Sequence, residues 1–327
     1  MNIRITLLML LLLIVSSSIY AIPFRKGDKT YTNPFFDTNK DKMYYVELNE
    51  VRSAGMGLQP VFVLLPPDYY KETKRYYPSI ILLGGLSESL AGPLPSSLYW
   101  IHDCNLEEAL IWMQSDSINA KAVWRMMPKD VIERYNKMLE TDKLEDVILI
   151  CPYTFAGLPE KFNKYIVEEL ISFMESKYRI ASNREFRGIN GVCLGGGMSF
   201  FYAFHYPELF SSVGGVQADI PDFTKHFIKD MLSNLDYIRK NIHVNLVESR
   251  GDSYLAANNL LVDRFKGYNM NCEYNVFLGG HGYAFYKAAG SKAAIYHHGL
   301  YFRKKLKEYR DDVALPVALS MLSKALN

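Results

Sequence analysis

The chain has 327 residues, of which 49% are hydrophobic and 22% are charged, a composition typical of a globular protein with one large core or at most two domains. The formal net charge is only +2 and gives no indication of a polyanionic partner. The sequence shows no basic stripe, which argues against nucleic-acid binding.

The first 21 residues have the pattern of a secretory signal peptide. Arg4 precedes an apolar run over residues 7–15, and residues 16–21 are typical of a cleavage region. The run is too short to span a bilayer comfortably, and an uncleaved membrane anchor is the alternative. We therefore expect an exported protein that is soluble and has no membrane partner after cleavage, with an extended lead-in over residues 22–42.

Four cysteines occur, at positions 104, 151, 193 and 272. Export would place them where disulfides can form. If Cys193 stays free, the other three permit one bridge and one leftover thiol, and the sequence does not determine which residues pair.

The chain after the lead-in begins with strand patterns. Apolar runs over residues 44–48 and 60–65, separated by a turn that contains glycine, predict an antiparallel pair. The run over residues 77–83 ends at two glycines and is typical of a strand buried on both faces.

Strand and helix patterns then alternate. The expected strands cover residues 146–151, 188–192, 212–216, 243–247 and 273–277, and the expected helices cover residues 162–178, 198–206, 223–239, 254–265 and 293–310. Such alternation predicts an α/β fold, with a mostly parallel sheet and helices on both of its faces.

No strand pattern occurs over residues 87–130, and a helix is expected from residue 131 to residue 139. A connection this long between two core strands is usually functional. We interpret it as a lid-like insertion whose aromatic residues, Tyr99, Trp100 and Trp124 among them, line an acyl or aryl pocket. The alternative is that they form the insertion's own small core.

The most informative stretch covers residues 187–200, where a short strand runs into a glycine-rich turn and a helical pattern. Its centre, Gly191-Val-Cys-Leu-Gly195, has the spacing of a nucleophile elbow with Cys193 at the nucleophile's position. The elbow requires small flanking residues because the turn is sharp, and the following helix N-terminus would favour a thiolate. A buried structural cysteine is the alternative. A dinucleotide-binding fingerprint fails for lack of its third glycine.

Two further candidates follow Cys193 in the order nucleophile, acid, histidine. Asp252 and His281 each come just after an expected strand. Because ligands bind at the carboxyl ends of parallel strands, we expect these side chains to meet there. His281 would act as general base and then acid, and Asp252 would orient the imidazole. Asp219 and, more weakly, Glu248 are rivals for the acid.

An oxyanion that forms at such a site must be held by backbone amides. We expect these to be the amide of Leu194, directly after the nucleophile, and that of Leu86, in the glycine turn after the third strand. We expect no cofactor and no metal. The adjacent residues His102, Asp103 and Cys104 cannot all point at one ion.

Together these segments resemble the putative-esterase family of α/β-hydrolases, which includes esterase D (S-formylglutathione hydrolase), feruloyl esterases, enterochelin esterases and mycolyltransferases. The resemblance rests on residues 77–86, on the helix that ends at Arg179, on the elbow, on residues 206–210, and on the glycine motifs that end at Asp252 and His281.

The resemblance implies an α/β-hydrolase fold over residues 43–310, followed by a C-terminal tail over residues 311–327. It also implies cofactor-free hydrolysis of an ester or thioester in a small-molecule or glycan-linked substrate, through an acyl-enzyme. It carries the nucleophile onto Cys193, the acid onto Asp252 and the base onto His281.

The family's nucleophile is serine, and this chain has cysteine. Dienelactone hydrolases and polyhydroxyalkanoate synthases are similar to it at this position. A thiol attacks activated esters and thioesters well but leaves more readily than an alkoxide, so that alkyl ester cleavage would suffer. A non-catalytic binding protein and an acyltransferase are the alternatives. The complete set of triad residues argues against the first, and nothing in the chain separates hydrolase from transferase or indicates an oligomeric state.

Overall fold

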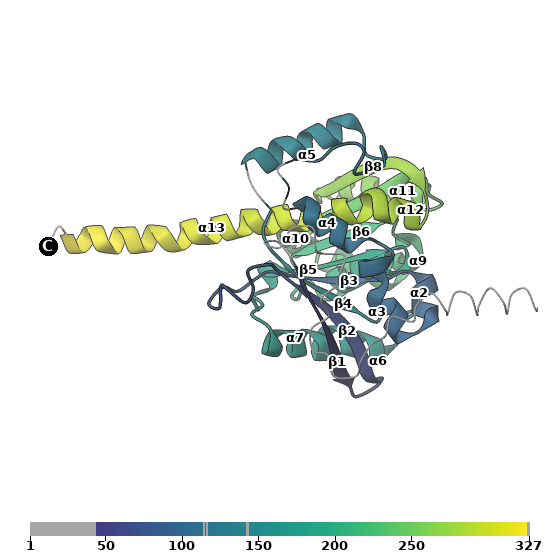
Figure 1. Ribbon diagram of the computed structural model, residues 1–327, viewed down its shortest axis with the longest axis horizontal. Coiled ribbons are helices and arrows are strands. Elements are labelled where there is room, and N and C mark those ends of the chain that lie inside the picture. The colour runs from purple at the N-terminus through teal and green to yellow at the C-terminus, as the bar shows by residue number, and fades with distance from the viewer. Residues whose placement is uncertain (1–43, 114, 116, 142–143, 326–327) are drawn as a thin grey trace, which may run out of the picture.

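The computed structural model describes residues 44–325, except 114, 116 and 142–143; the expected signal peptide and lead-in lie outside the described residues. Within the described part, eight strands form one sheet in the order β1-β2-β4-β3-β5-β6-β7-β8, with helices on both faces (Figure 1). This confirms the predicted α/β fold. No helix in the described part is long and apolar enough to cross a membrane.

The strands lie close to their expected positions. Strands β1 and β2 form an antiparallel pair, β2 also runs antiparallel to β4, and the remaining pairs are parallel. The bounds are β1 (Tyr45–Ser53), β2 (Gly57–Leu65), β3 (Ser79–Leu83), β4 (Ile148–Pro152), β5 (Arg187–Val192), β6 (Ser212–Val216), β7 (His243–Gly251) and β8 (Cys272–Gly280).

Strands β7 and β8 continue beyond their expected ends, and this positions the site. Their parallel pairing extends, through a bulge, until Gly251 lies opposite Gly280. The residues that follow, Asp252 and His281, therefore leave neighbouring strands at matching heights.

The helices after β4 cover both faces of the sheet. A continuous helix with a π-helical middle is formed by α6 (Glu160–Lys164), η2 (Tyr165–Leu170) and α7 (Ile171–Lys177), and a short 3₁₀ turn, η3 (Arg184–Phe186), precedes β5. The others are α8 (Leu194–His205), α9 (Ile220–Ser233), α10 (Leu235–Asn241), α11 (Leu255–Gly267), α12 (Tyr283–Phe285), the π turn η4 (Tyr286–Gly290) and α13 (Ser291–Ala325).

Two helix boundaries differ from the expectation. The helix expected over residues 223–239 is divided into α9 and α10 at Asn234, whose side chain donates to the carbonyl of Asp230. The expected helix end near residue 310 is wrong, because α13 continues through the expected tail to Ala325. The C-terminal part of this helix projects away from the domain (Figure 1). Apolar periodicity reports only the part of a helix that packs on a core.

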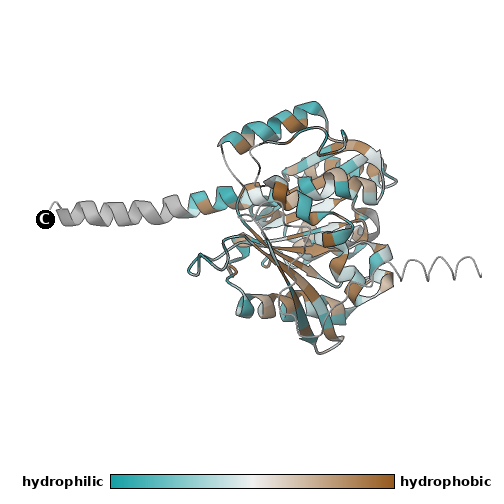
Figure 2. Ribbon diagram, viewed as in Figure 1, coloured by the Kyte–Doolittle hydropathy of each residue, from teal (hydrophilic) through white to brown (hydrophobic). Residues whose placement is uncertain are grey.

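The insertion contains α2 (Leu86–Ala91), α3 (Pro93–His102) and α4 (Leu106–Met113), and α5 (Lys129–Thr141) follows it. Tyr99, Trp100 and Trp112 are buried in a core that the insertion shares with the sheet, and the Trp100 indole donates to the carbonyl of Leu83 at 2.9 Å. These three residues are therefore part of the main core and do not form a separate small core of the insertion. Figure 2 shows the apolar strands at the centre and polar positions along α5.

Candidate active site

Cys193 lies at the turn between β5 and α8, in a conformation that residues other than glycine rarely adopt. Its φ is 50° and its ψ is −118°. The backbone is held on both sides: the Cys193 amide donates to the carbonyl of Val216 at 3.0 Å, and its carbonyl accepts from the amides of Gly197 and Asp219 at 3.2 and 2.9 Å. Such strain persists only where the surroundings fix it, as at a nucleophile elbow.

The glycines on either side of Cys193 are required by space. A Cβ on Gly191 would lie 2.1 Å from the carbonyl of Gly195. A Cβ on Gly195 would lie 2.5 Å from the carbonyl oxygens of Leu83 and Gly84. The elbow therefore packs directly against the end of β3, as the glycine spacing of the sequence predicted.

All four cysteines lie in the described residues, and all are free thiols, so that none of the bridges that the sequence permitted is formed. Cys193 is partly exposed. Burial raises the pKa of Cys272 to about 12, and it raises the pKa values of Cys104 and Cys151 as well.

His281 and Asp252 form the expected pair. The Nδ1 of His281 lies 2.9 Å from Oδ2 of Asp252, whose side chain is fully buried. The other oxygen of Asp252 accepts from the amide of Tyr254 at 2.6 Å, which fixes the carboxylate. Hydrogen bonds with Asp252 and then with Cys193 raise the pKa of His281 to about 10. The structure thus brings the thiol, the imidazole and the carboxylate together.

The acid hydrogen-bonded to Nδ1 of His281 is Asp252, and the two rival acids have other positions in the fold. The amide of Asp219 donates to the carbonyl of Cys193, and Asp219 directly precedes α9. Glu248 is buried beside Asn258, which donates to its carboxyl group at 2.7 Å. Burial, with the negative charge of Asp252, raises the pKa of Glu248 to about 8. Glu248 is therefore mostly neutral at pH 7.

The two amides expected to hold an oxyanion both stand at helix starts. Leu86 is the first residue of α2 and Leu194 is the first residue of α8. Amides in the first turn of a helix have no acceptor within it, so that they are available to a ligand. The close approach of Gly195 to Gly84 places the two turns side by side.

Gln217 is a residue that the sequence analysis missed. It directly follows β6, is fully buried and has a φ of 47°. Its side-chain nitrogen donates to the carbonyl of Gly280 at 2.9 Å and to the Ser249 hydroxyl at 2.5 Å, and its oxygen accepts from the amide of Gly282 at 3.1 Å. One amide group therefore holds the backbone on both sides of His281. Its place directly after a strand, at the edge where ligands bind, is the signal that could have identified it.

Two tyrosines after His281 were also missed. The hydroxyl of Tyr286 lies 3.1 Å from Nε2 of His281. The hydroxyl of Tyr283 donates to the carboxylate of Glu88 and lies 3.2 Å from the Ser87 hydroxyl. Tyr283 thus connects the histidine loop to α2, which begins at Leu86.

The comparisons with known proteins agree with this geometry. A family model described as "Putative esterase" matches residues 56–222, more than half of the chain. Among solved structures, the chain is similar to a ferulic acid esterase, with 17% identity, a TM-score of 0.57, and coverage of 80% of this chain and 99% of that one.

Two further structures are similar. S-formylglutathione hydrolase FrmB from Staphylococcus aureus has 16% identity and a TM-score of 0.52, with 79% of this chain and 97% of that chain covered. A mutant of the feruloyl esterase module from Clostridium thermocellum, complexed with sinapinate, has 14% identity and a TM-score of 0.56, with 82% and 92% covered. These likenesses establish the α/β-hydrolase fold.

Proposed function

Since the chain belongs to the putative esterase family and is an ester-hydrolysing enzyme, we propose that it cleaves an ester or thioester through Cys193, His281 and Asp252 by way of an acyl-enzyme. One observation supports this most directly. His281 is hydrogen-bonded at Nδ1 to a buried carboxylate, and its pKa is raised first by that carboxylate and then by the thiol of Cys193, which is held at a strained elbow.

The pKa of His281 is raised to about 10, so that the imidazole carries a proton at neutral pH. The proposed nucleophile is the thiolate of Cys193 that forms beside this imidazolium. The start of α8 adds the positive end of a helix dipole beside the sulfur.

The thiolate of Cys193 attacks the carbonyl carbon, and the electron pair of the C=O bond moves to the oxygen. The amides of Leu86 and Leu194 hold this oxyanion. When the intermediate collapses, the bond to the leaving oxygen or sulfur breaks, and His281 gives its proton to the leaving group. Cys193 is then acylated.

Water completes the reaction. Neutral His281 takes a proton as water attacks the thioester carbon, the carbon–sulfur bond breaks, and the acid leaves while the ion pair re-forms. Because a thiolate leaves more readily than an alkoxide, the first intermediate returns to substrate unless the leaving group is good. We therefore propose aryl esters and thioesters, rather than simple alkyl esters, as the substrate class.

The test measures nitrophenol release from short-chain nitrophenyl esters before and after treatment with iodoacetamide. We expect complete loss of turnover with one alkyl group on Cys193, since the other three thiols are held protonated by burial. Mass spectrometry after mixing with substrate should find the acyl group on the peptide that contains Cys193. Turnover that survives full alkylation of this residue would remove cysteine from the mechanism.

The same assay separates hydrolase from acyltransferase. If the protein is a hydrolase, the free acid should stay the main product when an alcohol or thiol acceptor is added. Acyl transfer to the acceptor would instead support an acyltransferase.

Export of the chain by its first 21 residues also stays a proposal, supported by the pattern of the sequence. Expression of the full chain with sequencing of the new N-terminus tests it. Cleavage after Ala21 is expected, and an intact N-terminus in the membrane fraction would contradict it.

A further inference from the structure

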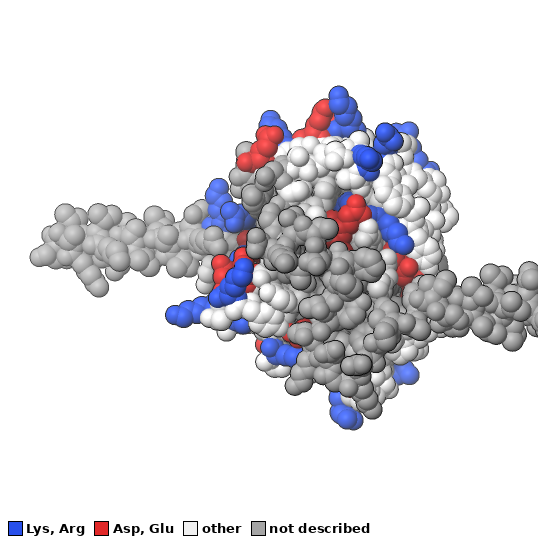
Figure 3. Space-filling model, viewed as in Figure 1, with Lys and Arg blue, Asp and Glu red and all other residues white. Residues whose placement is uncertain are grey.

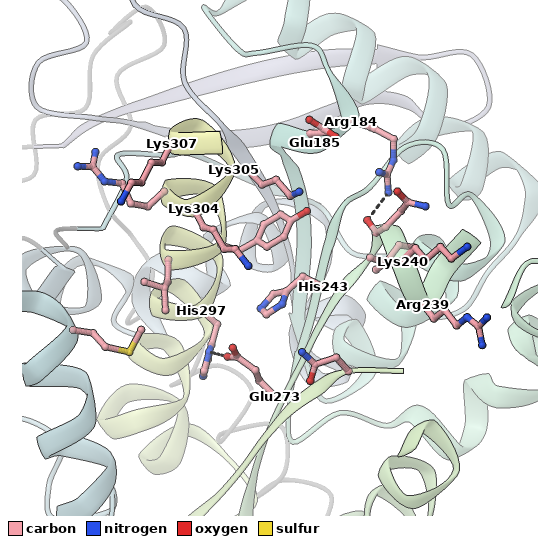
Figure 4. Close-up of a pocket in the computed structure, with 17 residues that line it drawn as sticks. Arg184, Glu185, Arg239, Lys240, His243, Glu273, His297, Lys304, Lys305 and Lys307 are labelled. Atoms are coloured by element: carbon pink, nitrogen blue, oxygen red, sulfur yellow. Dashed lines mark hydrogen bonds and ion pairs between the residues drawn. The ribbon is translucent and has the colours of Figure 1, made fainter. Parts of the chain in front are cut away.

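A cavity of about 560 Å³ lies at the edge of the sheet where β7 and β8 begin, between α10 and α13 (Figure 4). Strand β7 starts in its wall at His243 and ends at Gly251, next to Asp252. At ~3.3 Å per residue, the strand separates the cavity from the catalytic residues by about 26 Å. The cavity is therefore not part of the active site.

The charges in its wall are mostly positive. Two lining residues of the described chain are acidic, Glu185 and Glu273, and seven are basic: Arg184, Arg239, Lys240, Arg303, Lys304, Lys305 and Lys307. We call this site the cationic cavity. The net charge of +2 for the whole chain conceals this concentration, because the basic residues come from segments far apart in the sequence. On the face drawn in Figure 3, basic and acidic side chains occur side by side, as along α5.

The carboxylates near the cavity compensate part of this charge. Arg239 is paired with Asp236 at 2.8 Å, and Arg303 is paired with Glu145 at 3.5 Å. Burial opposes the ionisation of Glu273, but the hydrogen bond from His297 lowers the pKa of Glu273 to about 2. Lys304 and Lys305 share the partly exposed Glu308 at 4.0 and 2.9 Å. Lys240 and Lys307 form no ion pair with any described residue.

One cation is fixed in place without a carboxylate. The guanidinium of Arg184 donates to three backbone carbonyls, those of Pro207, Phe210 and Asn241. These contacts orient the group but leave its full charge. A fixed cation that needs no rearrangement is what an anion site requires.

The wall also holds a rigid pair of rings. The rings of His243 and Tyr301 are stacked, with centroids 5.0 Å apart and an angle of 9° between their planes. Burial lowers the pKa of His243 to about 4, so that the imidazole is neutral at pH 7 and can donate one N–H.

We propose that the cationic cavity binds a small molecule that carries two or more phosphate or sulfate groups. Its volume lies in the usual range for ligand pockets of proteins. Lysine and arginine are the side chains that bind such groups best, and a partly enclosed site is screened less by salt than an open surface. The concave shape favours a compact anion over a membrane surface, which needs a flat or convex face.

The test is isothermal titration calorimetry of the full chain at 0.15 M salt, with pyrophosphate as the phosphate probe and sucrose octasulfate as the sulfate probe. We expect saturable 1:1 binding of at least one probe. The double variant Lys240→Glu with Lys304→Glu should weaken it by ~10-fold or more, because two favourable contacts become repulsive. Which probe binds more tightly distinguishes the two anion chemistries.

The matched control is Lys71→Glu with Lys121→Glu, which makes the same charge change at exposed lysines outside the cavity. Its affinity should stay within twofold of the wild type. An equal loss in both double variants would show general attraction by net charge and would overturn the proposal, as would the absence of saturable binding of either probe. Binding only to vesicles of anionic lipid would overturn it in favour of a membrane surface. Because all four lysines are exposed, thermal unfolding should change little in either variant.

Discussion

Helix α8 has a histidine–aspartate pair at each end. Beside its first turn, Nδ1 of His281 lies 2.9 Å from Asp252. At its last residue, one helix length of ~18 Å away, Nδ1 of His205 lies 2.5 Å from Asp230. The two pairs use the same atoms. They differ in burial, because the side chain of Asp252 is fully buried and that of Asp230 is 36% exposed.

This difference in burial shows that a hydrogen-bonded histidine–aspartate pair is not by itself a catalytic site. An exposed ion pair is screened by water and contributes little, typically ~0–1 kcal/mol. A buried carboxylate acts strongly on its histidine, and the pKa of His281 accordingly rises to about 10. Only the first pair also has a thiol beside it, at the helix end whose dipole favours negative charge.

The largest effect on activity is expected from removal of the sulfur of Cys193. Cys193→Ala should lower kcat/KM for nitrophenyl esters by at least ~10³-fold, since loss of the nucleophile removes covalent catalysis. Cys272→Ala is the matched control, because Cys272 is also partly buried but its thiol is held protonated, and it should retain activity. Equal activities of the two variants would contradict the assignment.

The next largest effect should come from the histidines themselves. His281→Ala should lower kcat by at least ~100-fold, the usual scale for general acid–base catalysis. His205→Ala removes the partner of Asp230 at the other end of α8 and should change kcat less than twofold. The measurement is the steady-state kcat of the two variants. A similar loss of kcat in both would show that His281 acts through the stability of α8.

The carboxylates differ in what they do to pH dependence. His281 must keep a proton to protonate the leaving group, so that activity should fall as the pH rises through about 10. Asp252→Asn removes the main cause of the raised pKa, which should move this alkaline limb of kcat/KM toward pH 6.5 and lower activity at pH 8 by ~10-fold or more.

Asp230→Asn should leave the limb where it is. A limb that stays near pH 10 after Asp252→Asn would mean that the carboxylate does not set the protonation of His281.

The smallest expected effect concerns Gln217. We expect Gln217→Met to lower kcat ~10-fold with KM little changed, because the histidine loop loses the two hydrogen bonds, at Gly280 and Gly282, that fix it beside Cys193. The rate of Cys193 alkylation at pH 7 should fall in parallel. Gln59→Met, at a buried glutamine of β2 that donates to Met56, is the control. Loss of thermal stability alone, with unchanged kcat and alkylation, would reduce Gln217 to a structural residue.

Local spacing in the chain was enough to predict the alternation of strands and helices and the turn at Cys193. The glycines that flank Cys193 are required by close contacts with residues nearby in the chain or with the end of β3. The five-residue pattern is therefore enough to predict the turn. The helix boundaries near Asn234 and residue 310 were less accurate, because they depend on a local cap and on where the helix leaves the core.

The order of the elements and the residue types at the ends of the strands could be predicted from the amino-acid sequence, because these are properties of neighbours along the chain. The folded chain was needed to show that Asp252 is the acid bonded to His281, that Gln217 holds the histidine loop, and that lysines from α10 and α13 share one cavity. Such choices depend on the register between strands and on the direction of each side chain, which are set by packing between segments far apart in the sequence.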